Sequence, residues 1–372
     1  MPYEIEFIGV GSEVKKDAEA ICFRWLDNRD YWNAVYKIGV FDGGFEAHGK
    51  KMVEHMNQYY FNSSDYYDKV IDCVFVSHSD QDHVIGIKTI LENFKVKNLY
   101  MNRPWLYLDD LYDKVNDGRI TKESLRKELR ETYEAIADIE DMALERGVYI
   151  HEAFQGEKIC DKLLIASPSK QFYLDLIVES AKTPLENNKT PLSMLYKGIK
   201  NYGYSLSETW NDELIREDAE TSAENETSII LRGSIDTNDG FLLVGDAGIR
   251  ALNKAMDYLD SIGEDVRYSI SNYQIPHHGS RHNINPSTLN RMIGAKVAEG
   301  VTIEKYAVAS VAKYSDHPRK MVTNAYIRRG VKTFKTDGEV IRHVHGNMPD
   351  RKWTSIEAIE FSRQVEKYDE DS

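Results

Sequence analysis

The sequence of 372 residues has few cysteines and no long apolar run. It contains no stretch of about 18 apolar residues, the minimum for a membrane-spanning helix. Its first residues, MPYEIEFIGV, lack the basic and then apolar pattern of a secretory signal. The three cysteines are too few and too widely spaced for a disulfide framework. We therefore expect a cytoplasmic protein with no membrane partner.

The sequence also has fewer basic than acidic residues. The net charge is −14, with 61 Asp and Glu against 47 Lys and Arg. Most of the excess lies in residues 104 to 148 and 171 to 226. An acidic balance disfavours unspecific binding to nucleic acid, which depends on Lys and Arg. Because the acids are concentrated in two segments, the bulk charge says nothing about a site elsewhere.

Short apolar runs alternate with helical patterns along the rest of the chain, which is typical of α/β proteins. Runs such as AICFRWLD, YKIGVFDGG, DCVFVS, FLLVGDAG and YAVASVA predict buried strands. Near the end, VKTFKT and VIRHVHG predict a closing hairpin. Helices are expected at about residues 49–60, 249–259 and 286–293, and after Pro318.

We expect one main domain over residues 1–345, with two insertions. The first, at about 104–148, is predicted to be helical, because apolar residues place one stripe along a single long helix that begins at Thr121. The second, at about 171–226, is acidic and rich in tyrosine, and it lacks periodicity. Both offer surfaces for self-association or for a partner protein. Residues 346–372 are expected to form a C-terminal helix and a charged tail.

The stretch VFVSHSDQDHVIGI, residues 74 to 87, places four residues of metal-ligand type between a strand and a helix. In an extended segment, side chains two positions apart point the same way, so His78 and Asp80 can share one ion. Asp82 and His83, on the turn into the helix, then face a second ion. The alternative is that the carboxylates cap the helix and the histidines are surface residues.

Residues of the same type follow two other predicted strands. Asp246 ends FLLVGD, and His277 and His278 lie in QIPHHGS. Ligand-type residues at the ends of three strands are hard to explain by helix capping alone. The sequence therefore favours a metal site with two ions.

Five segments, in this order, resemble the metallo-β-lactamase fold superfamily, and more narrowly the metal-hydrolase domain of competence-type DNA-uptake channel proteins. They are GVFDGG, SHSDQDHVIGI, NETSIILRG with FLLVGDAG, PHHGS, and SDHP with the turn Thr336 to Gly338. The resemblance spans about residues 1–345 and implies an αββα sandwich, in which two mixed β-sheets are flanked by helices. The chain departs from the family in the stretch GVGSEVKKDAEA and at Lys313, where the family usually has Asn.

The resemblance also implies a set of ligands. One ion would be held by His78, Asp80 and a bridging Asp246. The second would be held by Asp82, His83, Asp246 and one of His277 and His278. Asp80 stands where the common superfamily pattern has His, and its oxygen-rich shell suits Mn²⁺ as well as Zn²⁺. Asp42, in GVFDGG, would brace the metal loop, and His151 would be a third ligand of the first ion.

Two divalent ions, Zn²⁺ or Mn²⁺, at about 3.5 to 4 Å would activate a shared water and stabilise both oxygens of an in-line displacement. We therefore expect a phosphodiesterase or nuclease whose substrate is a nucleic acid or a nucleotide-type phosphodiester. The residues expected to act on the reacting groups are Asp82, His278, His317 and Lys313, the last two by binding phosphate or protonating the leaving oxygen. For His317 and Lys313 the alternative is ordinary loop polarity.

Two other functions fit the sequence less well. One is hydrolysis of an amide, lactone or thioester bond, for which a histidine-rich first site is usual and Asp80 is not. The other is a non-catalytic interaction component of a multi-protein, defence-type system, with the acidic insertions as docking surfaces.

Overall fold

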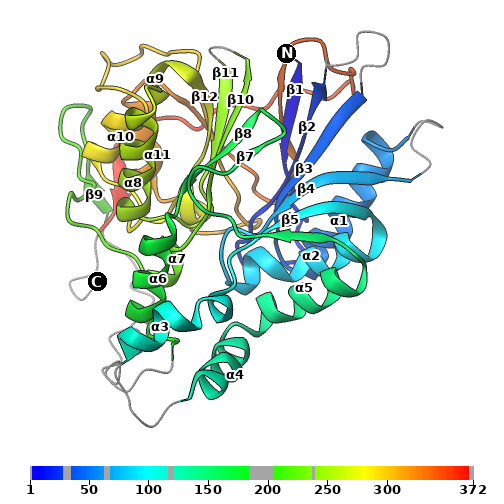
Figure 1. The fold of residues 1–372 in the computed structure, drawn as a ribbon. Coiled ribbons are helices and arrows are strands. Elements are labelled where there is room, and N and C mark those ends of the chain that lie inside the picture. Colours follow the sequence, from blue (N-terminus) through cyan, green and yellow to red (C-terminus); the bar gives the residue numbers. More distant parts are fainter. Residues whose placement is uncertain are drawn as a thin grey trace.

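Two β-sheets pack face to face at the centre of the computed structural model, which describes residues 2–27, 35–62, 68–115, 121–183, 205–236 and 239–367 (Figure 1). The first sheet has the strand order β15-β1-β2-β3-β4-β5-β6, and the second has the order β14-β13-β12-β11-β10-β8-β7. Each sheet is antiparallel on one side and parallel on the other.

In the first sheet, β15, β1, β2 and β3 pair antiparallel, and β3 to β6 pair parallel. The strands are β1 (Tyr3–Phe7), β2 (Ala20–Asp27), β3 (Val35–Gly43), β4 (Val70–Phe75), β5 (Lys95–Tyr100), β6 (Tyr149–His151) and β15 (Ile341–His345). In the second sheet, β11 to β14 pair parallel, and β7, β8, β10 and β11 pair antiparallel. The strands are β7 (Lys158–Ile159), β8 (Leu163–Ser167), β10 (Ile230–Asp236), β11 (Asp239–Leu243), β12 (Ile270–Gln274), β13 (Tyr306–Ala309) and β14 (Lys332–Lys335).

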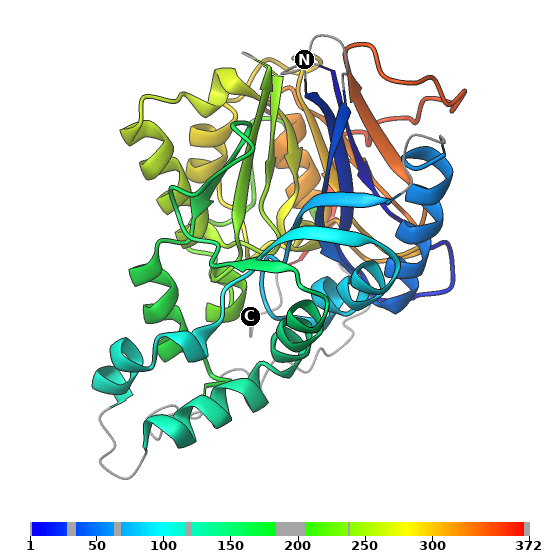
Figure 2. The same cartoon turned by 45° about the vertical axis from the view of Figure 1, so that its right-hand side comes forward.

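Helices cover the outer face of each sheet (Figures 1 and 2). Those on the first sheet are α1 (Glu46–Tyr59), α2 (Gln81–Asn93) and α5 (Glu134–Glu145), and those on the second are α8 (Ile249–Ser261), α10 (Pro286–Met292) and α11 (Lys320–Ile327). The remaining elements are η1 (Pro104–Leu106), α3 (Leu108–Val115), α4 (Lys122–Thr132), α6 (Lys170–Glu179), α7 (Ala223–Glu226), α9 (Val266–Ser269), η4 (Pro276–Gly279), and the small pair β9 (Ser205–Ser207) and β16 (Gln364–Glu366).

Three apolar clusters hold the four layers together. One lies between each sheet and its helices, and the third fills the space between the sheets with aromatic side chains such as Phe23, Phe41 and Phe241. Burial on both faces explains why the strands appear in the sequence as continuous apolar runs. The predicted αββα sandwich with two mixed sheets is confirmed.

The predicted closing hairpin is wrong. β14, from VKTFKT, pairs with β13 in the second sheet, whereas β15, from VIRHVHG, pairs with β1 in the first. The turn between them crosses from one sheet to the other, and there the N–H of Gly338 donates to Val311 O and its carbonyl accepts from Gly11 N. Each strand completes a different sheet edge because those open edges offer more backbone hydrogen bonds than a two-stranded hairpin would.

The predicted long helix of the first insertion is two helices. α4 ends at Thr132 and α5 begins at Glu134, because Tyr133 has non-helical dihedral angles (φ −106°, ψ 44°). The predicted stripe is nevertheless buried, at Leu125, Leu129, Ile136, Ile139 and Ala143. In the second insertion, residues 184–204 lie outside the described residues.

The described part of the C-terminal segment, residues 346 to 367, contains no helix, in contrast to expectation. It runs extended instead, so that the guanidinium of Arg351 reaches the buried carboxylates of Glu4 and Glu6, each at 2.6 Å. These ion pairs tie the extended segment to β1. Among the described residues, no helix has both the length and the apolarity that a membrane crossing requires.

Candidate metal centre

The loops that carry ligand-type residues meet at one end of the sandwich. Parallel strands end at the same edge of a sheet, so the loops after β4 and β3 lie together, as do those after β11, β12 and β13. Because the two sheets face each other, the two sets of loops also come together. Close approach is possible because Gly245 has a positive φ (53°) and would place a Cβ only 2.8 Å from the Ser77 side chain.

Asp246 lies at the centre of this group. Its Oδ1 is 3.1 Å from Nε2 of His83, and its Oδ2 is 3.4 Å from Nε2 of His277 and 3.9 Å from Nε2 of His78. Each oxygen thus faces a different set of imidazole nitrogens, as a carboxylate between two cations would.

The remaining ligand-type residues divide between the two sides of Asp246. Oδ2 of Asp80 is 3.8 Å from Nε2 of His78, and Oδ2 of Asp82 is 3.5 Å from Nε2 of His278. We call His78, Asp80 and His277, with Asp246 Oδ2, the first half-site. We call Asp82, His83 and His278, with Asp246 Oδ1, the second half-site. His277 and His278, between which the sequence leaves the choice of ligand open, approach different carboxylates, Asp246 and Asp82.

In the second half-site, both histidines have Nδ1 fixed as a hydrogen-bond donor. Nδ1 of His83 donates to Asp42 Oδ2 at 2.7 Å, and Nδ1 of His278 donates to the carbonyl of Ser310 at 2.7 Å. Neither acceptor has a proton to give. In the neutral imidazole the lone pair is therefore on Nε2, which points into the cluster.

The histidines of the first half-site are also held at Nδ1, each by two contacts. Nδ1 of His277 lies 3.0 Å from Asn283 Oδ1 and 3.2 Å from Asn225 Nδ2. Nδ1 of His78 lies 3.0 Å from Ser77 Oγ, which donates to Asp42, and 3.3 Å from Ser228 Oγ. These contacts orient all four imidazoles, and those of His83 and His278 also set the tautomer that metal-ligating histidines use.

The buried Nε2 atoms of His78, His83 and His278 have no hydrogen-bond partner among the described residues. A buried polar atom without a partner costs about 1 to 3 kcal/mol, and three in one place are exceptional. Two groups of these ligand atoms lie within 4.8 Å of one another: His78, His83 and Asp246; Asp82, His83 and His278. A divalent cation in each half-site would satisfy these atoms, so the donor set fits Zn²⁺ or Mn²⁺.

Burial and neighbouring charges perturb the titration of the cluster. Burial opposes the charge of His83, but Asp246 and Asp42 raise its pKa well above the ordinary value. Burial likewise opposes the charge of Asp246, whose pKa is nevertheless held far below its usual range by His277 and His83. Burial also opposes the charge of His278, but the Asp82 carboxylate, 3.5 Å from its Nε2, outweighs burial and raises the pKa to about 9. A proton and a cation therefore compete for the same nitrogens.

Asp80 does not act as a helix cap. It occupies the N-cap position of α2, but within the described chain its side chain forms no capping hydrogen bond. Its Oδ1 accepts instead from the ammonium of Lys182 at 2.7 Å. The geometry thus disfavours the alternative in which the carboxylates of this turn serve only to cap the helix.

His151 lies outside both half-sites. Its Nε2 pairs with Asn98 Oδ1 at 3.0 Å, and its ring stacks on Tyr100 with centroids 4.7 Å apart. Lys313 contacts the ring of Tyr314, with its ammonium 5.6 Å from the centroid. None of these contacts is with a residue of the half-sites.

His317 lies beside the second half-site. The N–H of Arg319 donates to the carbonyl of Gly279, which places the SDHP loop against the residue that follows His278. Nδ1 of His317 donates to Asp17 Oδ2 at 2.9 Å, so its Nε2 is the nitrogen that can exchange a proton. The side chain is 27% exposed, which leaves it accessible to a substrate.

Sequence reasoning missed two carboxylates behind the cluster, Asp17 and Glu19. Asp17 anchors the His317 loop through the backbone N–H of Ala312 at 2.8 Å. Glu19 is fully buried, accepts the hydroxyl of Ser310, and has its pKa raised to about 7 by burial. Both lie in DAEA, within the stretch GVGSEVKKDAEA that departs from the family pattern. The only sequence signal for them is that two acidic residues stand directly before an apolar strand.

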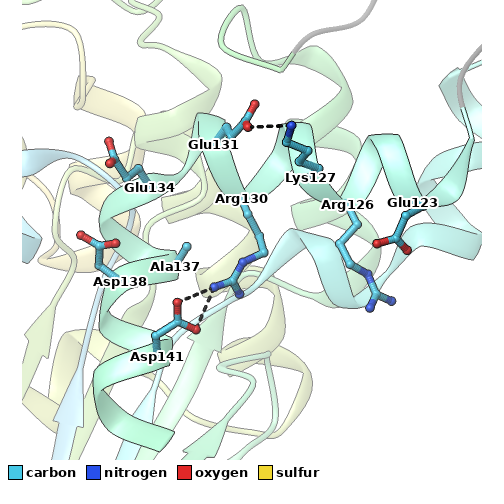
Figure 3. Close-up of a pocket in the computed structure, with 9 residues that line it drawn as sticks. All are labelled: Glu123, Arg126, Lys127, Arg130, Glu131, Glu134, Ala137, Asp138 and Asp141. Atoms are coloured by element: carbon cyan, nitrogen blue, oxygen red, sulfur yellow. Dashed lines mark hydrogen bonds and ion pairs between the residues drawn. The ribbon is translucent and has the colours of Figure 1, made fainter. Parts of the chain in front are cut away.

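A surface groove between α4 and α5 lies apart from the cluster (Figure 3). Charges of both signs line it and partly pair with each other, as in the contacts of Arg130 with Asp141 and Lys127 with Glu131. Acids outnumber bases in its lining, so it does not favour a phosphate group.

No protein-family model matches the sequence, and no curated protein matches it significantly. Among solved structures, the chain is similar to a diphosphatase from the PhnP family, with 10% identity and a TM-score of 0.39, over 92% of this chain and 98% of the other. It is also similar to a long-form RNase Z from yeast, with 11% identity and a TM-score of 0.38, over 91% of this chain and 42% of the other. Neither similarity is high enough to transfer a substrate or a reaction.

Proposed function

We propose that this protein is a metal-dependent hydrolase of phosphodiester bonds, with two divalent ions, Zn²⁺ or Mn²⁺, in the two half-sites. One observation carries the proposal. Four histidines, each held by a hydrogen bond at Nδ1, direct Nε2 toward three carboxylates, and the three most buried Nε2 atoms have no hydrogen-bond partner among the described residues.

The side chains of each half-site would bind and orient the ions. Such a pair of ions, when bound, lowers the pKa of a water molecule and stabilises charge on the attacking and leaving oxygens. Asp42 holds His83 in its ligand orientation, and Ser310 does the same for His278. His317, oriented by Asp17, would hold the proton that the leaving oxygen takes up.

The ligand chemistry favours phosphodiesters over amides, lactones and thioesters. Each half-site contains a carboxylate of its own, Asp80 or Asp82, besides the shared Asp246, and such oxygen-rich shells suit Mn²⁺ as well as Zn²⁺. A nucleic acid or a nucleotide-type diester is the substrate class that we infer.

The test is hydrolysis of bis-p-nitrophenyl phosphate, single-stranded DNA and plasmid DNA by protein reconstituted with Mn²⁺ or Zn²⁺, with elemental analysis of the same samples. We expect turnover of at least one phosphodiester, and its loss in Asp246→Ala. A thioester and a lactone serve as comparison substrates.

Asp239→Ala is a matched control, because Asp239 also lies in the second sheet and accepts from Tyr3 and Asn272, outside both half-sites. If fully metallated protein cleaves no phosphodiester, or if it cleaves the thioester or lactone in preference, the proposal is wrong.

A further inference from the structure

The second insertion contributes a cation to the first half-site. Lys182 follows α6, is 102 residues from Asp80 in sequence, and donates from its ammonium to Asp80 Oδ1 at 2.7 Å. Its side chain is 46% exposed, so it contacts Asp80 and is also accessible from solvent.

Buried hydrogen bonds hold the backbone around Lys182 in place. Ser180 and Thr183 are 1% and 3% exposed. The hydroxyl of Tyr133 lies 3.4 Å from Ser180 Oγ and 3.2 Å from Thr183 Oγ1. Ser180 in turn donates to Glu224 Oε1 at 2.5 Å, and its oxygen accepts from the N–H of Lys182. The backbone that carries Lys182 is therefore anchored at a fixed point, from which the side chain reaches Asp80.

The break between α4 and α5 belongs to the same arrangement. Tyr133 is the residue whose non-helical angles separate the two helices, and its ring is 5% exposed. An unbroken helix would point this side chain differently, because its backbone would have helical angles. The first insertion thus fixes Lys182 through Tyr133, and the second supplies it.

The contact with Asp80 engages only one of the hydrogen-bond donors of the Lys182 ammonium. An ammonium has three N–H donors, and the contact with Asp80 Oδ1 takes one. The other oxygen, Oδ2, faces Nε2 of His78. A cation in the first half-site would draw the charge of Asp80 toward that oxygen, and the ammonium would become more available to another anion.

We propose that Lys182 binds an anionic, non-bridging oxygen of the substrate's phosphoryl group beside the first half-site. The inference rests on the proposed function and deepens it, since it selects anionic diesters over neutral amides, lactones and thioesters. A charge-assisted hydrogen bond of this kind changes affinity by about 10-fold or more.

The test compares Lys182→Met, which keeps the length of the side chain, with Lys182→Arg and with Lys170→Ala. Lys170 is a matched control: it is a lysine of the same segment, 48% exposed, and pairs with Asp110 at 2.8 Å, outside the cluster. The measurements are the metal content, the Kd for inorganic phosphate in the Mn²⁺-loaded protein, and KM and kcat for bis-p-nitrophenyl phosphate.

In Lys182→Met we expect unchanged metal content, a rise of about 10-fold in the Kd for phosphate, and a similar rise in KM. Lys182→Arg should recover part of the phosphate affinity, and Lys170→Ala should match the native protein. Unchanged phosphate affinity in metal-loaded Lys182→Met would overturn the inference, as would a loss of metal, which would show that Lys182 only braces Asp80.

The two proposals can fail separately. Hydrolysis of diesters that does not depend on Lys182 would leave the proposed function in place and overturn this inference. Phosphate binding that depends on Lys182, in a protein that cleaves no diester, would support the role of Lys182 and overturn the proposed function.

Discussion

Asp42 accepts the Nδ1 proton of His83 at 2.7 Å through one oxygen and the backbone N–H of Ser77 at 2.7 Å through the other. This carboxylate is fully buried and lies near the end of β3. It ties that strand both to the loop that carries His78 and to the first turn of α2. A single side chain therefore sets the position of the loop and the tautomer of one candidate ligand.

Asp42→Asn should weaken metal binding by about 10- to 100-fold, because the amide has only one oxygen and cannot accept both hydrogen bonds. The measurement is the Kd for Mn²⁺ and Zn²⁺ by competition with a chelator. Asp72→Asn is the control, since Asp72 is also buried and accepts from Ile38 N and Lys37 but belongs to neither half-site. Equal affinities for the two variants would show that Asp42 does not orient His83.

Separate loss of His277 and His278 should remove different ions. His277→Ala is expected to lower the occupancy of the first half-site and His278→Ala that of the second, so each variant should retain about one ion instead of two. Elemental analysis after dialysis measures the stoichiometry. His282→Ala, four residues after His278 in the same loop, should keep the native metal content. If His277→Ala binds as much metal as the native protein, His277 is not a ligand.

Gly86→Ala should destabilise the fold by about 2 kcal/mol or more, despite the gain of about 1 kcal/mol in helix propensity. A Cβ at this position of α2 would lie 1.9 Å from the carbonyl oxygen of Gly43, and backbone cannot yield as a side chain can. Because α2 carries Asp82 and His83, metal affinity should fall as well.

Urea denaturation with chelator gives the stability, and a metal titration gives the affinity. Gly147→Ala is the comparison: its Cβ would meet open space, so only the strain of its positive φ (68°), about 1 to 2 kcal/mol, is expected. A Gly86→Ala protein as stable as the native one would contradict the close approach of α2 and β3.

Acidification should destabilise the protein through Glu6. Burial opposes its charge, but hydrogen bonds from His55 and Arg351 lower its pKa to about 2. A carboxyl whose folded pKa is below its unfolded value of about 4.3 stabilises the fold above that value, and the stabilisation is lost as pH falls toward 2. The contribution is about 3 kcal/mol at neutral pH.

The free energy of unfolding, measured in urea with chelator from pH 6 to pH 2.5, should therefore fall less steeply in Glu6→Gln than in the native protein. Glu123→Gln, in an exposed helix turn of the first insertion, should follow the native profile. Parallel profiles for the native protein and Glu6→Gln would mean that other groups cause the acid sensitivity.

The amino-acid sequence determined much of this protein locally. Apolar runs buried on both faces can form only the inner strands of a layered α/β fold, and polar residues of ligand type directly after such runs must lie at strand ends. The buried strands, the outer helices and the grouping of His78, Asp80, Asp82 and His83 in one turn follow from patterns a few residues long, whereas the sandwich of two sheets was expected only from the family resemblance.

Only the tertiary structure decided which distant residues meet. The assignment of β14 and β15 to different sheets, the separation of His277 from His278 across Asp246, and the arrival of Lys182 at Asp80, 102 residues away, depend on contacts between separate segments of the chain. The tautomer of His278 was likewise set by the carbonyl of Ser310, 32 residues further along the chain. Local periodicity carries no information on such contacts, because they are set by the packing of the two sheets against each other.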